Sequence, residues 1–346
     1  MKNRLSSLVY GLFVLVLLTS TIAANAAPSE TWPKEFSIAT TDPGSMPYMI
    51  GANWVKLLGG EHRMTPTVVV KPGMAKVVDL NKGLLDVAII SSLDILQQLG
   101  GLGQYATVGP QNKMRLVCLA SINPFHIAVR TNSSVNSVKD FKGKVVSGIG
   151  DVRVPTNPAG NKLIIEAYGI SPSDLSTPIQ ANSTSDYQRL FREGGVEVYS
   201  QCHEVGQPGL VELTRSIPTR FVSLDDKEVN YIVQKSGGWL MPANIPANTY
   251  TGQDKELKSI GFSFSFYANP QVPDNVVYEL FKYVADPKYI GGFRALHASL
   301  SKYTLQSAIA SPTAPYHNGV VRYLKENGLW TNELEQKQTS LLQLFK

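Results

Sequence analysis

The stretch Phe36-Ser-Ile-Ala-Thr-Thr-Asp-Pro-Gly-Ser-Met-Pro-Tyr-Met-Ile-Gly-Ala-Asn-Trp-Val-Lys-Leu-Leu58 combines the signals of a strand, a turn and a helix. The strand pattern breaks at Asp42-Pro43-Gly44, and apolar residues then recur at helical spacing. A helix that begins directly after a strand presents unpaired backbone N–H groups, which suit an anion. The stretch therefore predicts an α/β protein with a ligand cradle close to its N-terminus.

The residues before this stretch have the three parts of a secretory leader. Lys2 and Arg4 give a positive start, and the apolar run Leu8–Leu18 is too short to span a bilayer comfortably. The small residues of Ala24-Asn-Ala26 form a cleavage site, so we expect the first 26 residues to be a signal peptide and the mature chain to begin at Ala27. This predicts a periplasmic protein, with an N-terminal membrane anchor as the alternative.

Charge and cysteine content exclude several classes of protein. The formal charge is +5, and removal of Lys2 and Arg4 with the leader leaves +5 − 2 = +3. The chain has no basic run of the kind that binds nucleic acid. Cys118 lies in an apolar, strand-like run, and we expect no bridge between it and Cys202 because the two belong to different lobes.

The sequence gives no positive sign of catalysis. Neither a G-x-S-x-G elbow, an H-E-x-x-H motif nor a Walker loop is present, and the five histidines show no metal-ligand spacing. A nucleophile pair of Ser91 and His203 would lack a third partner. We therefore expect no enzyme activity, no cofactor and no metal.

Strand-like and helical runs alternate along the chain, which predicts sheets with helices on both faces. The strand-like runs are Thr67–Val70, Asp86–Ser91, Arg115–Ala120, His126–Arg130, Lys144–Ser147, Thr177–Gln180, Val196–Ser200 and Ile260–Tyr267. The helical runs are Pro47–Leu58, Met74–Asn81, Leu93–Leu99, Ala159–Tyr168, Tyr187–Arg192, Leu210–Ser216, Asp274–Ala285, Tyr289–Leu300 and Gly319–Glu326. In such sheets ligands bind beyond the carboxyl ends of the strands.

Several segments follow the order found in one family of binding proteins. They are Thr67-Val-Val-Val-Lys-Pro-Gly73, Val77-Val-Asp-Leu-Asn-Lys-Gly-Leu-Leu-Asp-Val-Ala88, Ser91-Ser-Leu-Asp94, Ser134-Val-Asn-Ser-Val-Lys-Asp-Phe-Lys-Gly-Lys-Val-Val146, Ile245-Pro-Ala-Asn-Thr-Tyr-Thr-Gly252 and Ala314-Pro-Tyr-His-Asn-Gly-Val-Val-Arg-Tyr-Leu-Lys-Glu-Asn-Gly328. Over nearly the whole mature chain they resemble the TAXI type of solute-binding subunit, which serves TRAP (tripartite ATP-independent periplasmic) transporters. The segment from Ser134 is typical of type II periplasmic binding proteins in general, whereas the last two are closer to the TAXI pattern alone.

The resemblance implies two α/β lobes, each a mostly parallel sheet flanked by helices, which close on one small solute. We assign residues 27–125 and 264–346 to lobe one and residues 126–263 to lobe two, so the runs at His126–Arg130 and Ile260–Tyr267 cross between the lobes. The resemblance also implies that the protein is a monomer and that it delivers a small organic anion or an amino acid to a TRAP permease driven by an ion gradient.

Three segments depart from the family pattern at or near the expected cleft. The family's Gly-Gly and Tyr-Tyr pairs are replaced by Pro43-Gly-Ser-Met-Pro-Tyr48, and its Gly-Ser-Gly-Thr loop by Gly150-Asp-Val-Arg-Val-Pro-Thr156. The family's Asp-Gly-x-Ile-Asp-Ala segment reads Glu193-Gly-Gly-Val-Glu-Val198. The amino-acid-like ligand that is usual for the family therefore does not transfer directly.

The candidate ligand-binding residues lie where strands end and helices begin, and they supply hydroxyl, amide and guanidinium groups. They are Thr40, Thr41, Ser45, Tyr48, Gly73, Met74, Ser91, Ser92, Arg153, Thr156, Asn157, Gln201, His203 and Gln207. Arg153 could meet a carboxylate with two hydrogen bonds, or it could pair with Asp151. Ser91 or Ser92 could equally serve as an ordinary helix cap. We expect His317 to be structural, since it opens a helix far along the chain.

Three other functions stay open at this stage. A binding protein of an ABC importer for sulfonate-like or nitrate-like anions shares the expected fold. A sensor module could present a ligand to a membrane kinase without transport. An enzyme on the same two-lobed fold is the remaining alternative, and turnover of a bound solute would reveal it.

Overall fold

The computed structural model describes residues 32–41, 43, 45–71, 73–151, 156–181 and 183–346. The expected signal peptide therefore lies outside the described residues. The segment from Trp32 to Lys346 forms one compact unit. Its strands are β1 (Glu35–Thr40), β2 (Thr65–Val70), β3 (Val87–Ser91), β4 (Arg115–Arg130), β5 (Val198–Cys202), β6 (Thr219–Phe221), β7 (Leu240–Ile245) and β8 (Leu257–Ala268).

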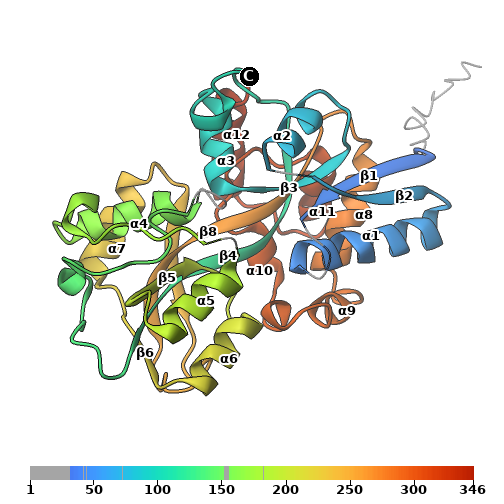
Figure 1. The fold of residues 1–346 in the computed structure, drawn as a ribbon. Coiled ribbons are helices and arrows are strands. Elements are labelled where there is room, and N and C mark those ends of the chain that lie inside the picture. The colour runs from blue at the N-terminus through green and yellow to red at the C-terminus, as the bar shows by residue number, and fades with distance from the viewer. Residues whose placement is uncertain (1–31, 42, 44, 72, 152–155, 182) are drawn as a thin grey trace, which may run out of the picture. The chain divides into compact units, whose positions relative to one another are not determined.

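Helices connect and cover these strands (Figure 1). The α-helices are α1 (Met46–His62), α2 (Gly73–Asn81), α3 (Ser92–Leu99), α4 (Thr156–Ala167), α5 (Thr184–Glu193), α6 (Pro208–Ser216), α7 (Asp226–Lys235), α8 (Asp274–Ala285), α9 (Ile290–Arg294), α10 (Leu305–Ile309), α11 (Asn318–Glu326) and α12 (Asn332–Leu344). Short 3-10 helices are η1 (Gly103–Tyr105), η2 (Val138–Phe141), η3 (Pro172–Asp174) and η4 (Ala298–Leu300). The mixed α/β fold that the alternating pattern predicted is confirmed.

The strands form a mixed sheet in the order β2-β1-β3-β8-β4-β5, with β6 paired to β4 and β7 paired to β8. Parallel pairs of these strands occur between β1 and β2 and between β1 and β3, whereas the pairs made by β4 and β8 are antiparallel. The expectation of a mostly parallel sheet in each lobe is therefore corrected. The long strands β4 and β8 run antiparallel to each other. Strands β5 and β6 also pair with β4 in the antiparallel direction.

Strand β4 is continuous for 16 residues, although the sequence suggested two separate runs. It pairs with β8 along most of its length, with shifts in register between Leu116 and Cys118 and between Leu119 and Ser121. Pro124 lies opposite Gly261. A Cβ atom on Gly261 would come within 2.8 Å of the Asn123 carbonyl oxygen, so the close approach of these strands requires glycine.

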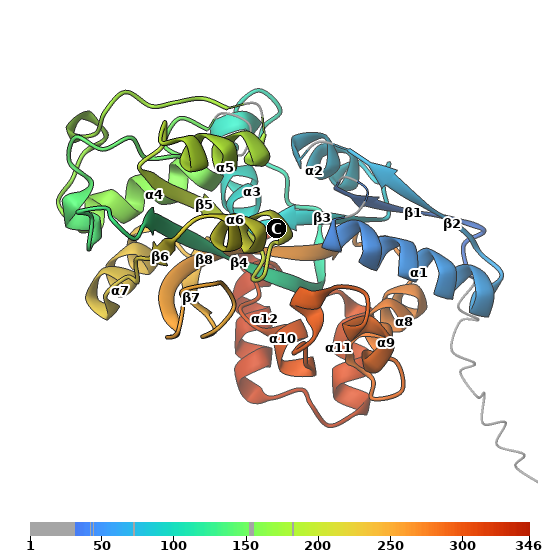
Figure 2. The same cartoon turned by 60° about the horizontal axis from the view of Figure 1, so that its bottom comes forward.

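Strands β4 and β8 each contribute side chains to two different groups of buried residues. The first core contains Leu116 and Val117 of β4 and Phe266 of β8, packed with α1, α8 and α11. The second core contains Phe125 of β4 and Phe262 of β8, packed with α4 and α7. The two strands therefore connect the two cores (Figures 1 and 2). The lobe boundaries proposed from the sequence stay a prediction.

A third buried group extends the second core beyond β5. Tyr187 and Phe191 of α5 pack with Tyr199 of β5, with Leu210 and Leu213 of α6, and with other apolar side chains. Both free cysteines are buried, Cys118 in the first core and Cys202 in the second. This placement agrees with the expectation that the two cysteines form no bridge.

Candidate functional site

The start of α1 gathers four of the predicted site residues. Ser45 is the N-cap of α1, and its hydroxyl accepts a hydrogen bond from the Tyr48 N–H at 3.3 Å. The hydroxyls of Thr41 and Ser45 lie 2.7 Å apart. Thr40 is fully buried at the end of β1 and donates its hydroxyl proton to the Thr41 carbonyl. The quoted stretch therefore forms the strand–turn–helix that its pattern predicted.

The starts of α2 and α3 lie next to each other. Ser91 ends β3, caps α3 and donates a hydrogen bond of 2.7 Å to the Asp94 carboxylate. A Cβ atom on Gly73 would lie 3.7 Å from Asp94 Oδ2, the oxygen that accepts this hydrogen bond. Met74 is half-buried against the first core. Asp94 also accepts hydrogen bonds from Gln104 and Tyr105, so the network around Ser91 supports both the helix cap and the packing.

Ser92 has a structural role that the sequence did not reveal. Its buried hydroxyl donates to the Trp239 carbonyl at 2.7 Å and accepts from the Ser263 N–H at 3.1 Å. Trp239 belongs to the second core, whereas Ile95, one turn along the same helix, belongs to the first. Ser92 therefore ties the start of α3 to the second core, and its hydroxyl is fully occupied in this arrangement.

Asn157, in the first turn of α4, is the centre of a buried polar network. Its side-chain oxygen accepts from the Cys202 backbone N–H at 3.0 Å and from the Cys202 thiol at 2.9 Å. Its NH2 group donates to Asp151 at 3.1 Å and to the Gln201 side-chain oxygen at 2.7 Å. Thr156 adds a contact of 3.6 Å from its hydroxyl to the Cys202 sulfur. The structure thus brings together three predicted residues, Thr156, Asn157 and Gln201.

Among the described residues, this network leaves the two N–H donors of the Gln201 side chain without a partner. The backbone N–H of Cys202 fixes which end of the Asn157 amide is the oxygen, and this in turn directs the Gln201 oxygen toward Asn157. The Gln201 Nε2 atom is buried and has no hydrogen-bond partner among the described residues. It lies near Gly148, whose φ of +82° and close approach to the Ser200 carbonyl require glycine. A buried NH2 group of this kind requires an acceptor oxygen.

Two histidines lie near Gln201, and the sequence analysis nominated only one of them. His203 contacts the Tyr199 hydroxyl through Nε2 at 2.6 Å, and His126 contacts the Tyr250 hydroxyl through Nε2 at 2.8 Å. The ring centroids of His126 and His203 are 5.9 Å apart. Burial lowers the pKa of His203 to about 4 and the pKa of His126 well below its ordinary value. Both rings are therefore neutral at neutral pH.

The contacts of His126 assign its protonation. Its Nδ1 atom lies 3.0 Å from the Pro124 carbonyl, which can only accept, so Nδ1 carries the proton. Nε2 consequently accepts from the Tyr250 hydroxyl, whose oxygen accepts from the Gly206 N–H at 3.0 Å. Tyr250 belongs to the Ile-Pro-Ala-Asn-Thr-Tyr segment that resembled the TAXI pattern. That segment therefore orients the loop between β5 and α6. This role depends on a contact between parts of the chain that are far apart in sequence.

The two remaining candidates have different outcomes. Gln207 is the N-cap of α6: its side-chain oxygen accepts from the Leu210 N–H at 2.6 Å and from Gln188 at 3.2 Å. Arg153 lies outside the described residues, so its contact with a carboxylate stays a prediction. His317 is the N-cap of α11 and is 1% exposed, which confirms the expected structural role.

A cavity of about 430 Å³ lies beside β4, close to the loop that follows His203. One wall comes from Glu204 and Val205, and the opposite wall comes from the segment 299–310, which contributes buried side chains to the first core. The lining residues are Leu119, Ala120, Ser121, Ile122, Glu204, Val205, Ser299, Lys302, Tyr303, Thr304, Gln306, Ser307 and Ala310. None of these residues was nominated from the sequence, because the segment 299–310 shows no strand-end pattern.

A larger cavity, of about 870 Å³, opens at the start of α4 and is lined by Asp151, Lys162 and several prolines. Its walls all come from the part of the chain between Ile149 and Gln180. We place the candidate site at the cavity beside β4 rather than here, because its walls come from three separate parts of the chain: β4, the loop after β5 and the segment 299–310.

The chemistry of the nominated side chains suits binding by neutral groups. Burial raises the pKa of the Cys202 thiol to about 12, so this sulfur is protonated and a weak nucleophile. Ser91 bonds to Asp94 and His203 to Tyr199, so neither contributes to a nucleophile pair with the other. Hydroxyls, amides and helix starts remain, and they can bind an oxygen-rich solute without a formal charge.

Within the described part of the chain, no helix has the length and hydropathy that crossing a membrane requires.

Comparison with solved structures finds several binding proteins of low sequence identity. The aliphatic sulphonate-binding protein SsuA of Escherichia coli is 14% identical, with 91% of this chain and 87% of that chain covered and a TM-score of 0.45. A TctC solute-binding protein from Polaromonas is 13% identical, with 91% and 96% covered and a TM-score of 0.48. The second substrate-binding domain of GlnP from Lactococcus lactis is 11% identical, with 79% and 96% covered and a TM-score of 0.41. These values carry no information about the ligand of the present chain.

A family comparison is more specific. The model of the NMT1-like family matches residues 38–328, which span the quoted strand–turn–helix, both long strands and the segment that ends at Gly328. The protein therefore belongs to the NMT1-like family.

Proposed function

We propose that this protein is a periplasmic solute-binding protein that captures one small solute and passes it to a membrane transporter, without chemical turnover. The observation that carries the proposal is the cavity beside β4, whose walls come from the first core and from the loop that follows Cys202 of the second core. Because β4 and β8 connect those cores, a small change in the twist of these strands would widen or narrow the cavity. This is the geometry that a receptor needs in order to trap and release a solute.

The expected solute is a small organic anion or an amino acid. The cavity of about 430 Å³ is at the small end of the range for ligand pockets. Its hydroxyl groups, together with Lys302 and Glu204, can bind carboxylate and ammonium groups. The Gln201 NH2 group, which has no acceptor among the described residues, adds a reason to expect a solute or water oxygen near the end of β5. A carboxylate contact with Arg153 remains part of the proposal.

The proposed partner is a TRAP permease, which the resemblance of the segments at Ile245–Gly252 and Ala314–Gly328 to the TAXI pattern favours. A neighbouring gene for a TRAP membrane subunit, together with uptake of the identified solute that requires this subunit, would support this partner. Uptake that requires a neighbouring ATPase instead would assign the protein to an ABC importer for an organic or inorganic anion.

Closure of the cavity should be visible through Trp239. Its carbonyl accepts the hydrogen bond from Ser92, so its surroundings change if the start of α3 moves relative to the second core. Mass spectrometry of the solutes that co-purify identifies the titrant, and we expect it to change the fluorescence of the wild type and of Trp54→Phe. The change should disappear in Trp239→Phe. Trp54 is the matched control because it is fully buried beside Phe266 in the first core. A signal that survives in Trp239→Phe would contradict this mode of closure.

A further inference from the structure

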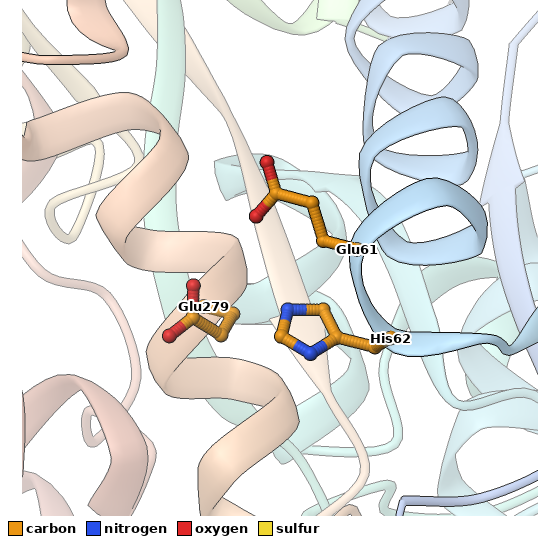
Figure 3. A group of neighbouring side chains, drawn as sticks. All are labelled: Glu61, His62 and Glu279. Carbon is orange, nitrogen blue, oxygen red and sulfur yellow. The ribbon is translucent and has the colours of Figure 1, made fainter.

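Two carboxylates and an imidazole converge between the end of α1 and the second turn of α8, far from the cavity residues in sequence (Figure 3). Glu61 and His62 are the last two residues of α1, and Glu279 belongs to α8. One ligand atom from each of the three side chains lies within 4.8 Å of the other two. The expectation of no metal was based on the spacing of the histidines, which cannot reveal this cluster because Glu279 is distant in sequence from Glu61 and His62.

The imidazole supplies the observation that points to a ligand. The Nε2 atom of His62 is buried, and none of the residues that the structure describes offers it a hydrogen-bond partner. Figure 3 shows the ring beside the Glu61 and Glu279 side chains, and Trp32 stacks on the ring with centroids 3.7 Å apart and planes at 10°. Stacking against Trp32 therefore holds the ring in place, whereas its Nε2 atom makes no hydrogen bond to the described residues. A metal ion would satisfy that nitrogen and both carboxylates together.

We infer that Glu61, His62 and Glu279 form a binding site for a divalent transition metal, with Zn²⁺ as the fitting ion. One imidazole nitrogen and two carboxylate oxygens are ligands that Zn²⁺ accepts, and water would complete a tetrahedral site. Ligand atoms around Zn²⁺ lie roughly 3.3 Å apart, as expected for four bonds of about 2.0–2.1 Å. The carboxylates must therefore move inward by about 1 Å, which rotation of the Glu61 and Glu279 side chains can provide.

Neighbouring groups orient the carboxylates, and one of them competes with the ion. Tyr283 donates its hydroxyl proton to Glu61 at 3.1 Å. Lys282 lies 3.1 Å from both oxygens of Glu279, but its side chain is 29% exposed and can turn outward. Two carboxylates lie beside the carbonyl end of α1, an arrangement that favours a cation, and Lys282 and the more distant Lys288 offset part of their charge. Binding the ion would tie α1, α8 and the segment at Trp32 together.

Calorimetric titration of Zn²⁺ into the full chain, prepared without a histidine tag and dialysed against a chelator, tests the site. We expect one saturable site per chain, with affinity reduced at least tenfold in His62→Ala and in Glu279→Gln. The matched control His297→Ala removes a half-buried histidine that bonds to Ser299 and should leave affinity unchanged. Lys282→Met should bind Zn²⁺ more tightly than the wild type, because the competing ammonium is gone.

The effect of Lys282→Met distinguishes a metal site from a structural cluster, since a merely structural role of Lys282 predicts no gain in affinity. Circular dichroism and a thermal unfolding curve without metal show whether each variant is folded. The proposal is overturned if folded wild-type protein shows no saturable Zn²⁺ binding, or if that binding persists unchanged in both His62→Ala and Glu279→Gln.

Discussion

Replacing Asn157 with leucine should lower the free energy of unfolding by about 3–5 kcal/mol. The substitution removes the acceptor of the Cys202 backbone N–H and the donors to Asp151 and Gln201, all of which are buried. Each buried polar group left without a partner costs about 1–3 kcal/mol. Urea denaturation of the purified variant and of the wild type at pH 7.5 measures the difference.

Two further variants test whether the loss of stability comes from the hydrogen bonds of Asn157. Asn157→Asp keeps the oxygen that Cys202 bonds to but loses both donated hydrogen bonds and faces Asp151, so a substantial part of the loss should remain. Asn136→Ala removes an exposed side chain that bonds only to the Ser134 carbonyl, and we expect a change within about 0.5 kcal/mol. A loss below about 1 kcal/mol in Asn157→Leu would show that the network is not a major source of stability.

Acid should destabilise the protein between pH 6.5 and pH 4 because its buried histidines resist protonation. Burial lowers the pKa of His203 and of His317 to about 4, whereas an imidazole in the unfolded chain titrates near 6.5. Within this window the unfolded state binds more protons than the folded state, so the free energy of unfolding falls as pH falls. Between pH 7 and pH 5 each of these two histidines should contribute a loss of about 2 kcal/mol.

His126 should add to this loss in the same direction, since burial lowers its pKa as well. Urea denaturation at pH 7, 6 and 5 measures the total, and His203→Gln and His317→Gln should each flatten the profile. The glutamine side chain cannot be protonated in this range, so it removes the linkage even if it costs stability at pH 7. A profile of equal steepness in both variants and in the wild type would contradict this explanation of the acid sensitivity.

Local signals in the sequence located many of the helices and strands correctly. Asp274–Ala285 matches α8 residue for residue, and Ser91 caps α3 as one of two residues nominated for that role. In both regions the signals are close in sequence, because a cap and the helix it begins are neighbours. The strand–turn–helix quoted from Phe36 to Leu58 was recognised for the same reason.

Other elements could not be predicted because distant contacts decide them. Strand β4 continues through Pro124, between the two predicted runs, since β8 pairs with it up to Pro124 and β5 pairs with it from Phe125 onward. The run Lys144–Ser147 becomes a single bridge at Val146 rather than a strand, and Thr177–Gln180 has no strand assigned to it. Helix α7 was missed because only Val229 and Ile232 of its residues are buried, a weak apolar pattern.

The residues of the candidate site divide in the same way: those with a local signal were nominated, and those defined by distant contacts were missed. Asn157 and Gln201 were nominated because they lie at a helix start and a strand end, although their mutual hydrogen bond spans 44 positions. His126 was missed as a site residue because its partner Tyr250 is 124 positions away. The walls of the cavity at Glu204 and Lys302 were missed because no pattern in the sequence shows that the segment 299–310 approaches the end of β5.

The most direct test of the central claim is calorimetric titration of the co-purifying solute into protein that has been unfolded, dialysed and refolded to remove bound ligand. The account predicts saturable binding of one small carboxylate or amino acid per chain, with no chemical change in the solute when mass spectrometry examines it after the titration. Absence of any saturable binding by correctly refolded protein, or recovery of the solute as a different molecule, would contradict the claim that this protein is a solute receptor.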